Sequence, residues 1–186
     1  HYHYFQGDPE MLEPRERQRQ RALSGSLAAL EIHEVVEDGE PIRLRSTQHW
    51  EAALAHDGSD GFVFVPRLLS VEQREIGKAD ADRIERTEYS EHDAAGNVGR
   101  KRRSFLFEGQ PDSEIISDER STFIAPSPAW LVKLVVREEV GGANGIERLR
   151  ETHYDGDPFT GLPLGDATRG LPTRVRELHL RDAATP

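Results

Sequence analysis

The chain has 186 residues, a formal net charge of -10 at pH 7 and no cysteine. The length suits one domain or two small ones. The negative charge argues against nucleic acid and anionic membrane surfaces as partners, because both need a basic surface. The lack of cysteine excludes a disulfide framework and a thiolate nucleophile. No apolar run approaches the roughly 20 residues of a membrane-spanning helix.

The N-terminal part of the chain divides into two segments. Residues 1–10 resemble the remains of a purification tag, since they contain Phe-Gln-Gly, the end of a protease site, and we give them no functional weight. Residues 11–21 form a charged lead-in without an apolar stripe, which predicts a solvated segment or one short helix. Residues 22–182 are expected to form a single β-rich domain or a segment excised from a larger shell.

From residue 22 onward, apolar and polar residues alternate in short runs separated by turn-forming residues. This pattern predicts antiparallel strands with one buried face. A helix is the competing interpretation for residues 24–36, but their β-branched end and the Asp38-Gly39 turn favour a strand. We therefore expect an all-β fold, a curved antiparallel sheet of hairpins. Strands are expected at 22–36, 42–47, 61–66, 68–76, 83–92, 98–107, 122–125, 130–136, 146–154 and 172–180, with loops at 56–61 and 108–118. Residues 49–55 are either a continuation of the second of these strands or a separate segment.

Two local features refine this prediction. Pro66 cannot donate to a strand ladder, which indicates a bulge or a sheet edge at that point. Residues 93–97, Asp-Ala-Ala-Gly-Asn, have the composition of a hairpin turn. The basic cluster that follows, Arg100 to Arg103, is either a phosphate-binding patch or the solvated face of a strand. The acidic chain around it favours the second interpretation.

The stretch from Thr152 to Gly170 is the densest in Gly, Asp and Pro, residues that set backbone angles rather than build regular elements. His153, Asp155 and Asp157 have the spacing of three ligands on one side of a strand. However, Phe159 and Thr160 stand where a calcium loop needs an oxygen ligand and a glycine. We therefore interpret the aspartates as turn formers, with Tyr154, Phe159 and Leu162 as the anchors of the stretch, and we expect no metal or other cofactor.

Other candidate chemistry is weaker. The sequence contains none of the common nucleophile, phosphate-loop or zinc-protease motifs. Trp50 and Trp130 could stack on sugars, but packing within the sheet is favoured by their apolar neighbours. Carboxylate pairs such as Glu138-Glu139 could serve a hydrolase, but an acidic chain forms such pairs by composition alone. We accordingly predict that the protein is not an enzyme.

The segment that begins at Tyr154 carries a signature of Gly, Pro, aromatic and charged residues. It comprises Tyr154, Asp155, Gly156, Phe159, Gly161, Leu162, Pro163, Leu164, Gly165, Gly170 and Arg174. Together with the turn at residues 92–98, this signature resembles the B component of the bacterial insecticidal Tc toxin complexes, a family that shares a domain with plasmid virulence proteins. The turn is similar to an Rhs-type (YD) repeat, with His92 where that family has Tyr. The resemblance is most specific near the C-terminal end, where Asp166 departs from the family's usual Gln.

The resemblance implies a role as the middle region of a secreted toxin component. Proteins of that family form a hollow shell of Rhs-type hairpins that encloses an unfolded toxic effector, so the segment would be wall and not catalyst. Its partners would be other toxin-complex subunits or the rest of its own parent chain. Exposed strand edges also predict self-association. A carbohydrate-binding or adhesive β-module and a β-rich hydrolase using Asp and Glu remain the alternatives.

Overall fold

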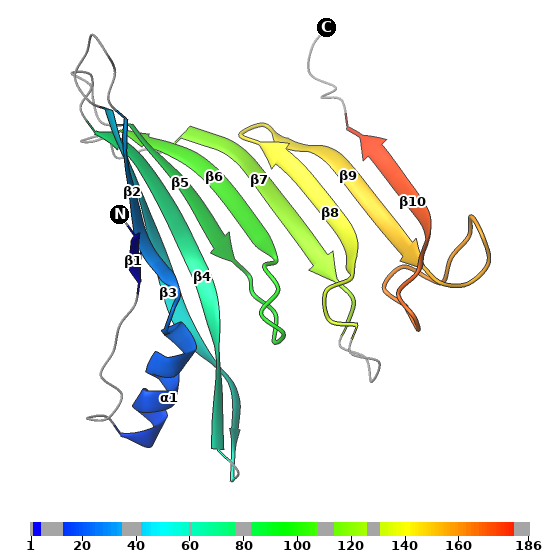
Figure 1. Ribbon diagram of the computed structural model, residues 1–186. Coiled ribbons are helices and arrows are strands. Elements are labelled where there is room, and N and C mark those ends of the chain that lie inside the picture. Colours follow the sequence, from blue (N-terminus) through cyan, green and yellow to red (C-terminus); the bar gives the residue numbers. More distant parts are fainter. Residues whose placement is uncertain are drawn as a thin grey trace, which may run out of the picture. The chain divides into compact units, whose positions relative to one another are not determined.

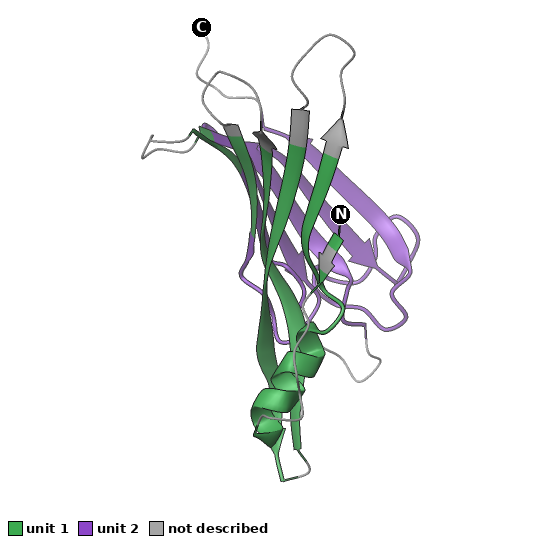
Figure 2. Cartoon of the chain, turned by 60° about the vertical axis from the view of Figure 1, so that its left-hand side comes forward, with its two compact units in different colours: residues 1–88, 104–114 green, residues 89–103, 115–186 purple. Residues whose placement is uncertain are grey.

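The computed structural model describes residues 2–4, 13–34, 42–59, 61–76, 83–107, 114–125 and 131–180. The chain divides into two compact units, residues 1–88 with 104–114 and residues 89–103 with 115–186 (Figure 2). The expectations for the Asp38-Gly39 turn and for Trp130 lie outside the described residues.

The protein is all-β, as predicted. In each unit, strands that are neighbours in the chain pair side by side and antiparallel, and they bend and twist along their length (Figure 1). This confirms the expected curved antiparallel sheet of hairpins. The first unit contains β1 (Tyr2–Tyr4), α1 (Pro14–Leu23), β2 (Leu27–Glu34), β3 (Ile42–Gly58) and β4 (Gly61–Ile76). The chain continues through β5 (Arg83–Ser90), β6 (Arg100–Phe107), β7 (Glu114–Phe123), β8 (Val135–Gly142), β9 (Gly145–Tyr154) and β10 (Pro172–His179).

The charged lead-in forms the short helix α1, which begins with Pro14 in its first turn and buries none of its residues. The helix continues through Ala22 and Leu23, so the strand expected from residue 22 begins instead at Leu27. Gly25, with φ of 82°, follows the helix in the left-handed conformation that commonly ends helices. The preference for a strand over a helix in the next segment is confirmed by β2.

The loop expected at residues 56–61 is shorter than predicted. β3 runs on to Gly58, where Asp57 pairs with Phe62 and Gly58 with Gly61. Main-chain pairing does not require apolar side chains. A hairpin end made of polar residues therefore has the composition of a loop. Pro66 lies opposite Ala52, outside the part of β4 that pairs with β5, so the expected edge position is confirmed.

Two expectations in the second half of the chain are wrong. The loop expected at 108–118 ends earlier, because β7 begins at Glu114 and carries polar residues that pair across strands. The strand expected at 130–136 is mostly a turn, since β8 begins only at Val135. The apolar side chains of Leu131 and Leu134 pack against a buried cluster. The apolar run therefore reflects this packing and not the alternation of a strand.

The buried part of the described chain is small. Among the described residues of the first unit, Ala52 is the buried hydrophobic residue, whereas Ile124, Val136 and Tyr154 form a cluster in the second unit. Leu131, Leu134 and Ala167 pack against this cluster. The cluster lies where β9 ends, so it anchors the Gly-rich segment that the sequence singled out.

Candidate functional site

The candidate site is the segment between β9 and β10, residues 155–171, here called the corner. Asp155 lies at its start, is 3% exposed and has a left-handed backbone with φ of 49°. Its Oδ2 atom accepts the backbone N–H groups of Thr168 at 2.7 Å, Arg169 at 2.9 Å and Gly170 at 3.1 Å. Its Oδ1 atom accepts the N–H of Leu171 at 3.1 Å. One carboxylate therefore gathers four consecutive backbone donors.

This arrangement stabilises the charged form of Asp155. The N–H groups of Arg169 and then Thr168 contribute most to holding the pKa of the Asp155 carboxyl well below its ordinary value, against the opposing effect of burial. A general acid or base at neutral pH needs a pKa near the working pH. The geometry and the direction of this shift indicate that Asp155 shapes the backbone.

The main chain closes around the same residue. The N–H of Asp155 donates to the carbonyl of Leu171 over 2.7 Å. The Thr173 hydroxyl lies 2.7 Å from the carbonyl oxygen of Asp155 and 3.3 Å from that of His153. The end of β9 is thus tied to the start of β10 through both backbone and side chains.

Tyr154 connects the corner to the buried cluster. Tyr154 is 8% exposed and packs with Ile124 and Val136, while its hydroxyl donates to the carbonyl of Val135 over 2.8 Å. Burial raises the pKa of the Tyr154 phenol. Satisfying the hydroxyl allows an aromatic ring to be buried without an unpaired polar atom. A Cβ at Gly170 would lie 2.9 Å from Leu134 Cδ1, so this glycine allows close packing over the cluster.

The corner glycines differ in what they do. Gly161 has φ of 71°, and a Cβ there would lie 2.6 Å from His153 Cβ and 2.9 Å from Thr173 Oγ1. Gly165 has φ of 99° with open space around the site of a Cβ. Gly156, also with positive φ, faces the backbone of Gly161. Gly161 therefore serves both backbone conformation and close approach, whereas Gly165 serves conformation alone.

The remaining signature residues differ in their exposure. Phe159 is 88% exposed with φ of 66°, so the expectation that it anchors the stretch together with Tyr154 and Leu162 is wrong. Leu162 is half-buried and its N–H donates to the Tyr154 carbonyl over 3.0 Å. Pro163, Leu164 and Arg174 are also exposed.

His153, Asp155 and Asp157, which have the spacing of metal ligands in the sequence, make separate contacts in the structure. His153 Nδ1 lies 3.0 Å from the carbonyl oxygen of Leu162, an acceptor that requires the proton on Nδ1. Asp155 is committed to the backbone, and Asp157 is exposed. Within the described residues, no three His, Asp or Glu side chains group as metal ligands would.

The turn between β5 and β6 is a second built element, and it confirms the predicted hairpin. Asp93 Oδ1 accepts the N–H groups of Ala95 and Asn97, each at 2.9 Å, while Asn97 Nδ2 donates to Asp93 Oδ2 at 2.8 Å. The Asn97 amide also donates to the carbonyl of Val132. Gly96 takes the left-handed conformation, with φ of 82°. The side chain of Asp93 therefore organises a turn that Asn97 attaches to a distant loop.

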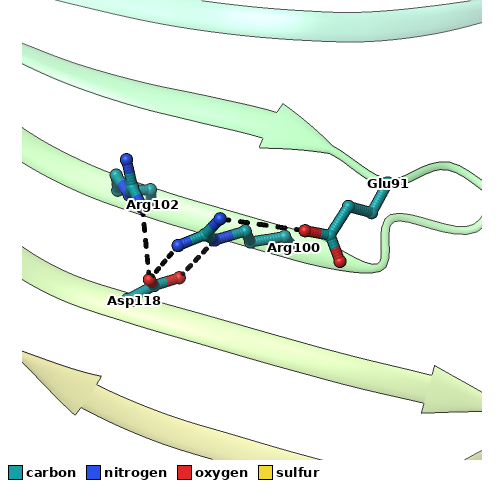
Figure 3. A network of polar contacts seen from close by, with 4 residues as sticks. All are labelled: Glu91, Arg100, Arg102 and Asp118. Carbon is teal, nitrogen blue, oxygen red and sulfur yellow. Dashed lines mark hydrogen bonds and ion pairs between the residues drawn. The ribbon is translucent and has the colours of Figure 1, made fainter. Parts of the chain in front are cut away.

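Three of the four cations of the basic cluster pair with carboxylates of the neighbouring strand β7, two of them with Asp118 (Figure 3). Arg100 Nε and Nη2 donate to the two Asp118 oxygens at 2.8 and 2.5 Å, and Arg102 lies 3.5 Å from Asp118. Lys101 lies 3.4 Å from Glu119. Hydrogen bonding to Arg100 lowers the pKa of the Asp118 carboxyl. These cross-strand pairs favour the interpretation of the cluster as a strand face over that of a phosphate patch.

The other candidate residues also have structural partners. Trp50 is half-buried, and its Nε1 donates to the carbonyl of Leu27 over 2.9 Å. Glu138 lies 3.8 Å from Arg150, and Glu139 lies 2.7 Å from Arg137. Each of these two carboxylates pairs with an arginine of the sheet. Within the described part of the chain they do not form a facing pair in a cleft.

A shallow groove of about 390 Å³ lies between α1 and the strands β3 and β4. It is lined by two arginines, Arg15 and Arg19, by two glutamates and by apolar residues of β3 and β4. Arg15 lies 3.9 Å from Asp57 and its guanidinium sits 5.2 Å from the centre of the Phe62 ring. Arg15 is therefore already paired within the first unit.

The contacts of Asp118, of Thr173 and of Asn97 with Val132 are not indicated by the sequence pattern. Asp118 stood inside an expected loop, although the cations of residues 100–103 called for acidic partners on a neighbouring strand. Thr173 and Asn97 act across long sequence separations, and no local pattern indicates such contacts.

Comparison of the chain with protein-family models, with curated proteins and with solved structures gave no match. Among the described residues, no helix combines the length and the apolar character that crossing a membrane requires.

Proposed function

We propose that this chain is a structural, non-enzymatic segment of a secreted bacterial toxin-complex protein, and that it forms part of a β-sheet shell that encloses or delivers a toxic effector. The observation that carries the proposal is the Asp155 carboxylate with its four backbone donors. This carboxylate belongs to the signature on which the family resemblance rests, and it serves the shape of the chain.

The sheet itself supports the same role. Its strands are joined as consecutive antiparallel hairpins, and few of its described hydrophobic residues are buried. A sheet with so little core of its own suits a part of a larger wall, because burial of apolar surface is the main stabilising term in folding. The partners proposed are the rest of the parent chain or other toxin-complex subunits.

A protection experiment tests the proposal. The complete gene product that contains this segment is purified together with its encapsulated cargo and treated with a protease. We expect the cargo to survive digestion in the wild-type protein and to be degraded after Gly161→Val, which breaks the corner. Phe159→Ser is the matched control, since it changes an exposed residue in the same corner. Cargo that is digested as fast in the wild type as in free form contradicts the proposal.

Two further assays separate the alternatives. Clear hits on a glycan array, lost on Trp50→Ala, would replace the shell with a carbohydrate-binding module. Turnover of a substrate that is abolished by a single carboxylate substitution in a stably folded protein would replace it with a hydrolase. The source gene gives an independent check, because the proposal expects a long reading frame beside other toxin-complex components.

A further inference from the structure

The outer edge of β10 is open in the described part of the chain. β10 pairs with β9 alone there, and it ends the strand order of the sheet (Figure 1). Residues 174–177 and His179 are exposed. An edge of this length presents unpaired N–H and C=O groups that can pair with another strand.

The register shows which groups are available. The N–H of Leu180 donates to the carbonyl of Glu147 over 2.8 Å, and the antiparallel pairing places Leu178 opposite Leu149 and Arg176 opposite Glu151. Bonding alternates along an antiparallel ladder, so residues 176 and 178 bond to β9. The N–H and C=O groups of residues 175, 177 and 179 therefore point away from β9, toward the open edge.

The charges on this edge select against a two-fold pairing of β10 with β10 of a second copy. Only odd-numbered residues can bond outward, which limits the registers. The longest of these place Arg174 opposite Arg176, Arg176 opposite its own copy, or Glu177 opposite its own copy. Like charges directly opposite each other on neighbouring strands are destabilising. An occupant of different charge is needed.

The strand β9, which pairs with the inner edge of β10, shows the charge pattern that fits this strand. Glu151 lies opposite Arg176, and Arg150 lies opposite Glu177. Side chains of paired residues share a face of the sheet, so the same pattern fits from either side of β10.

We propose that the outer edge of β10 accepts an antiparallel strand that carries an acidic residue opposite Arg176 and a basic residue opposite Glu177. The inference deepens the proposed shell and rests on it, because it assigns the chemistry of the strand that continues the wall. Main-chain bonds at residues 175, 177 and 179 supply affinity, and the two charge pairs set the register.

A synthetic peptide with the β9 sequence GIERLRETHY, labelled with a fluorophore, tests the edge by fluorescence polarisation against the whole chain. We expect saturable binding. A second peptide with Arg150→Glu and Glu151→Arg reverses both charges and should bind about tenfold more weakly, because two attractive pairs become repulsive. Equal binding of the two peptides, or no binding at millimolar concentration, overturns the proposal.

A pair of protein variants locates the site. Val175→Pro removes an N–H that points outward and bonds to nothing on β9, so it should abolish peptide binding while the circular dichroism spectrum is unchanged. Val175→Thr keeps the N–H and should bind as the wild type does. Undiminished binding by a folded Val175→Pro variant overturns the proposal. Light scattering that shows a dimer lost in Val175→Pro would assign the edge to a second copy instead.

The outcomes distinguish this inference from the proposed function. If the peptide does not bind, the proposed neighbouring strand is refuted, while the proposed protection of cargo by the parent protein is not affected. A failed protection experiment with positive peptide binding removes the shell and leaves β10 as a strand-binding edge.

Discussion

The Thr173 hydroxyl donates to the backbone carbonyl of Asp155 over 2.7 Å, which links the second residue of β10 to the residue that follows β9. The same aspartate holds the N–H groups of residues 168–171 through its carboxylate. Two strands and the chain between them are thus fastened at one residue. The stability of the corner should depend on this residue more than on any exposed member of the signature.

Replacing Asp155 with Asn should destabilise the protein strongly. The amide offers one acceptor oxygen in place of two and directs an N–H toward backbone N–H groups, so at least one buried donor loses its partner. We expect a fall in melting temperature of more than about 5 °C in a thermal denaturation monitored by circular dichroism. Asp157→Asn, a change at an exposed neighbour, is the control and should shift the melting temperature by less than about 1 °C. Equal shifts in the two variants would contradict the assignment.

The stability that Asp155 provides should depend on pH in a defined window. Its pKa is lowered in the folded state, whereas an unfolded Asp titrates near about 3.9. The contribution is therefore complete above the unfolded value and is lost as pH falls through the lower folded value. Urea titrations at several pH values from neutral down to acid should show the gap between wild type and Asp155→Asn narrowing below about pH 4. A gap that stays constant with pH would refute this account.

Gly161 and Gly165 should respond differently to alanine. At Gly161 the new Cβ meets His153 and Thr173 in addition to the left-handed strain, and we expect a loss of about 2 to 4 kcal/mol. At Gly165 the strain acts alone, and the loss should be about 1 to 2 kcal/mol. Urea denaturation of both variants measures the difference. If Gly165→Ala is the more damaging substitution, the close approach at Gly161 is not the controlling feature.

The sequence could predict that the corner consists of turns, because Gly, Asp and Pro have backbone preferences that operate locally. It could not predict which donors Asp155 would bind, since these come from residues 168–171, which are distant in the chain. The exposure of Phe159 also could not be predicted from the sequence, because it depends on which residues pack around the side chain. Its aromatic ring suggests an anchor, but Phe159 is 88% exposed.

Strand prediction failed where composition and pairing disagree. The polar segment that ends near Asp118 has the composition of a loop. Its C-terminal part is nevertheless a strand, in which Asp118 pairs with Arg100 of the neighbouring strand. The apolar run at residues 131–134 looks like a strand, yet it packs as a turn on the Tyr154 cluster. Both errors arise because a local window records the kinds of residue present and not their partners.

The Arg100–Asp118 pair should contribute modestly to stability and in a salt-dependent way. Both side chains are partly exposed, about 21% each, so solvent screens a pair whose two-point geometry is otherwise favourable. A double-mutant cycle with Arg100→Gln and Asp118→Asn should give a coupling free energy of about 0.5 to 1 kcal/mol at low salt. The coupling should fall when the ionic strength is raised to 1 M, where the Debye length is only about 3 Å. The more exposed Lys101–Glu119 pair, cycled in parallel, should couple more weakly. A larger coupling for that pair would mean that two-point geometry is not what makes the Arg100 contact favourable.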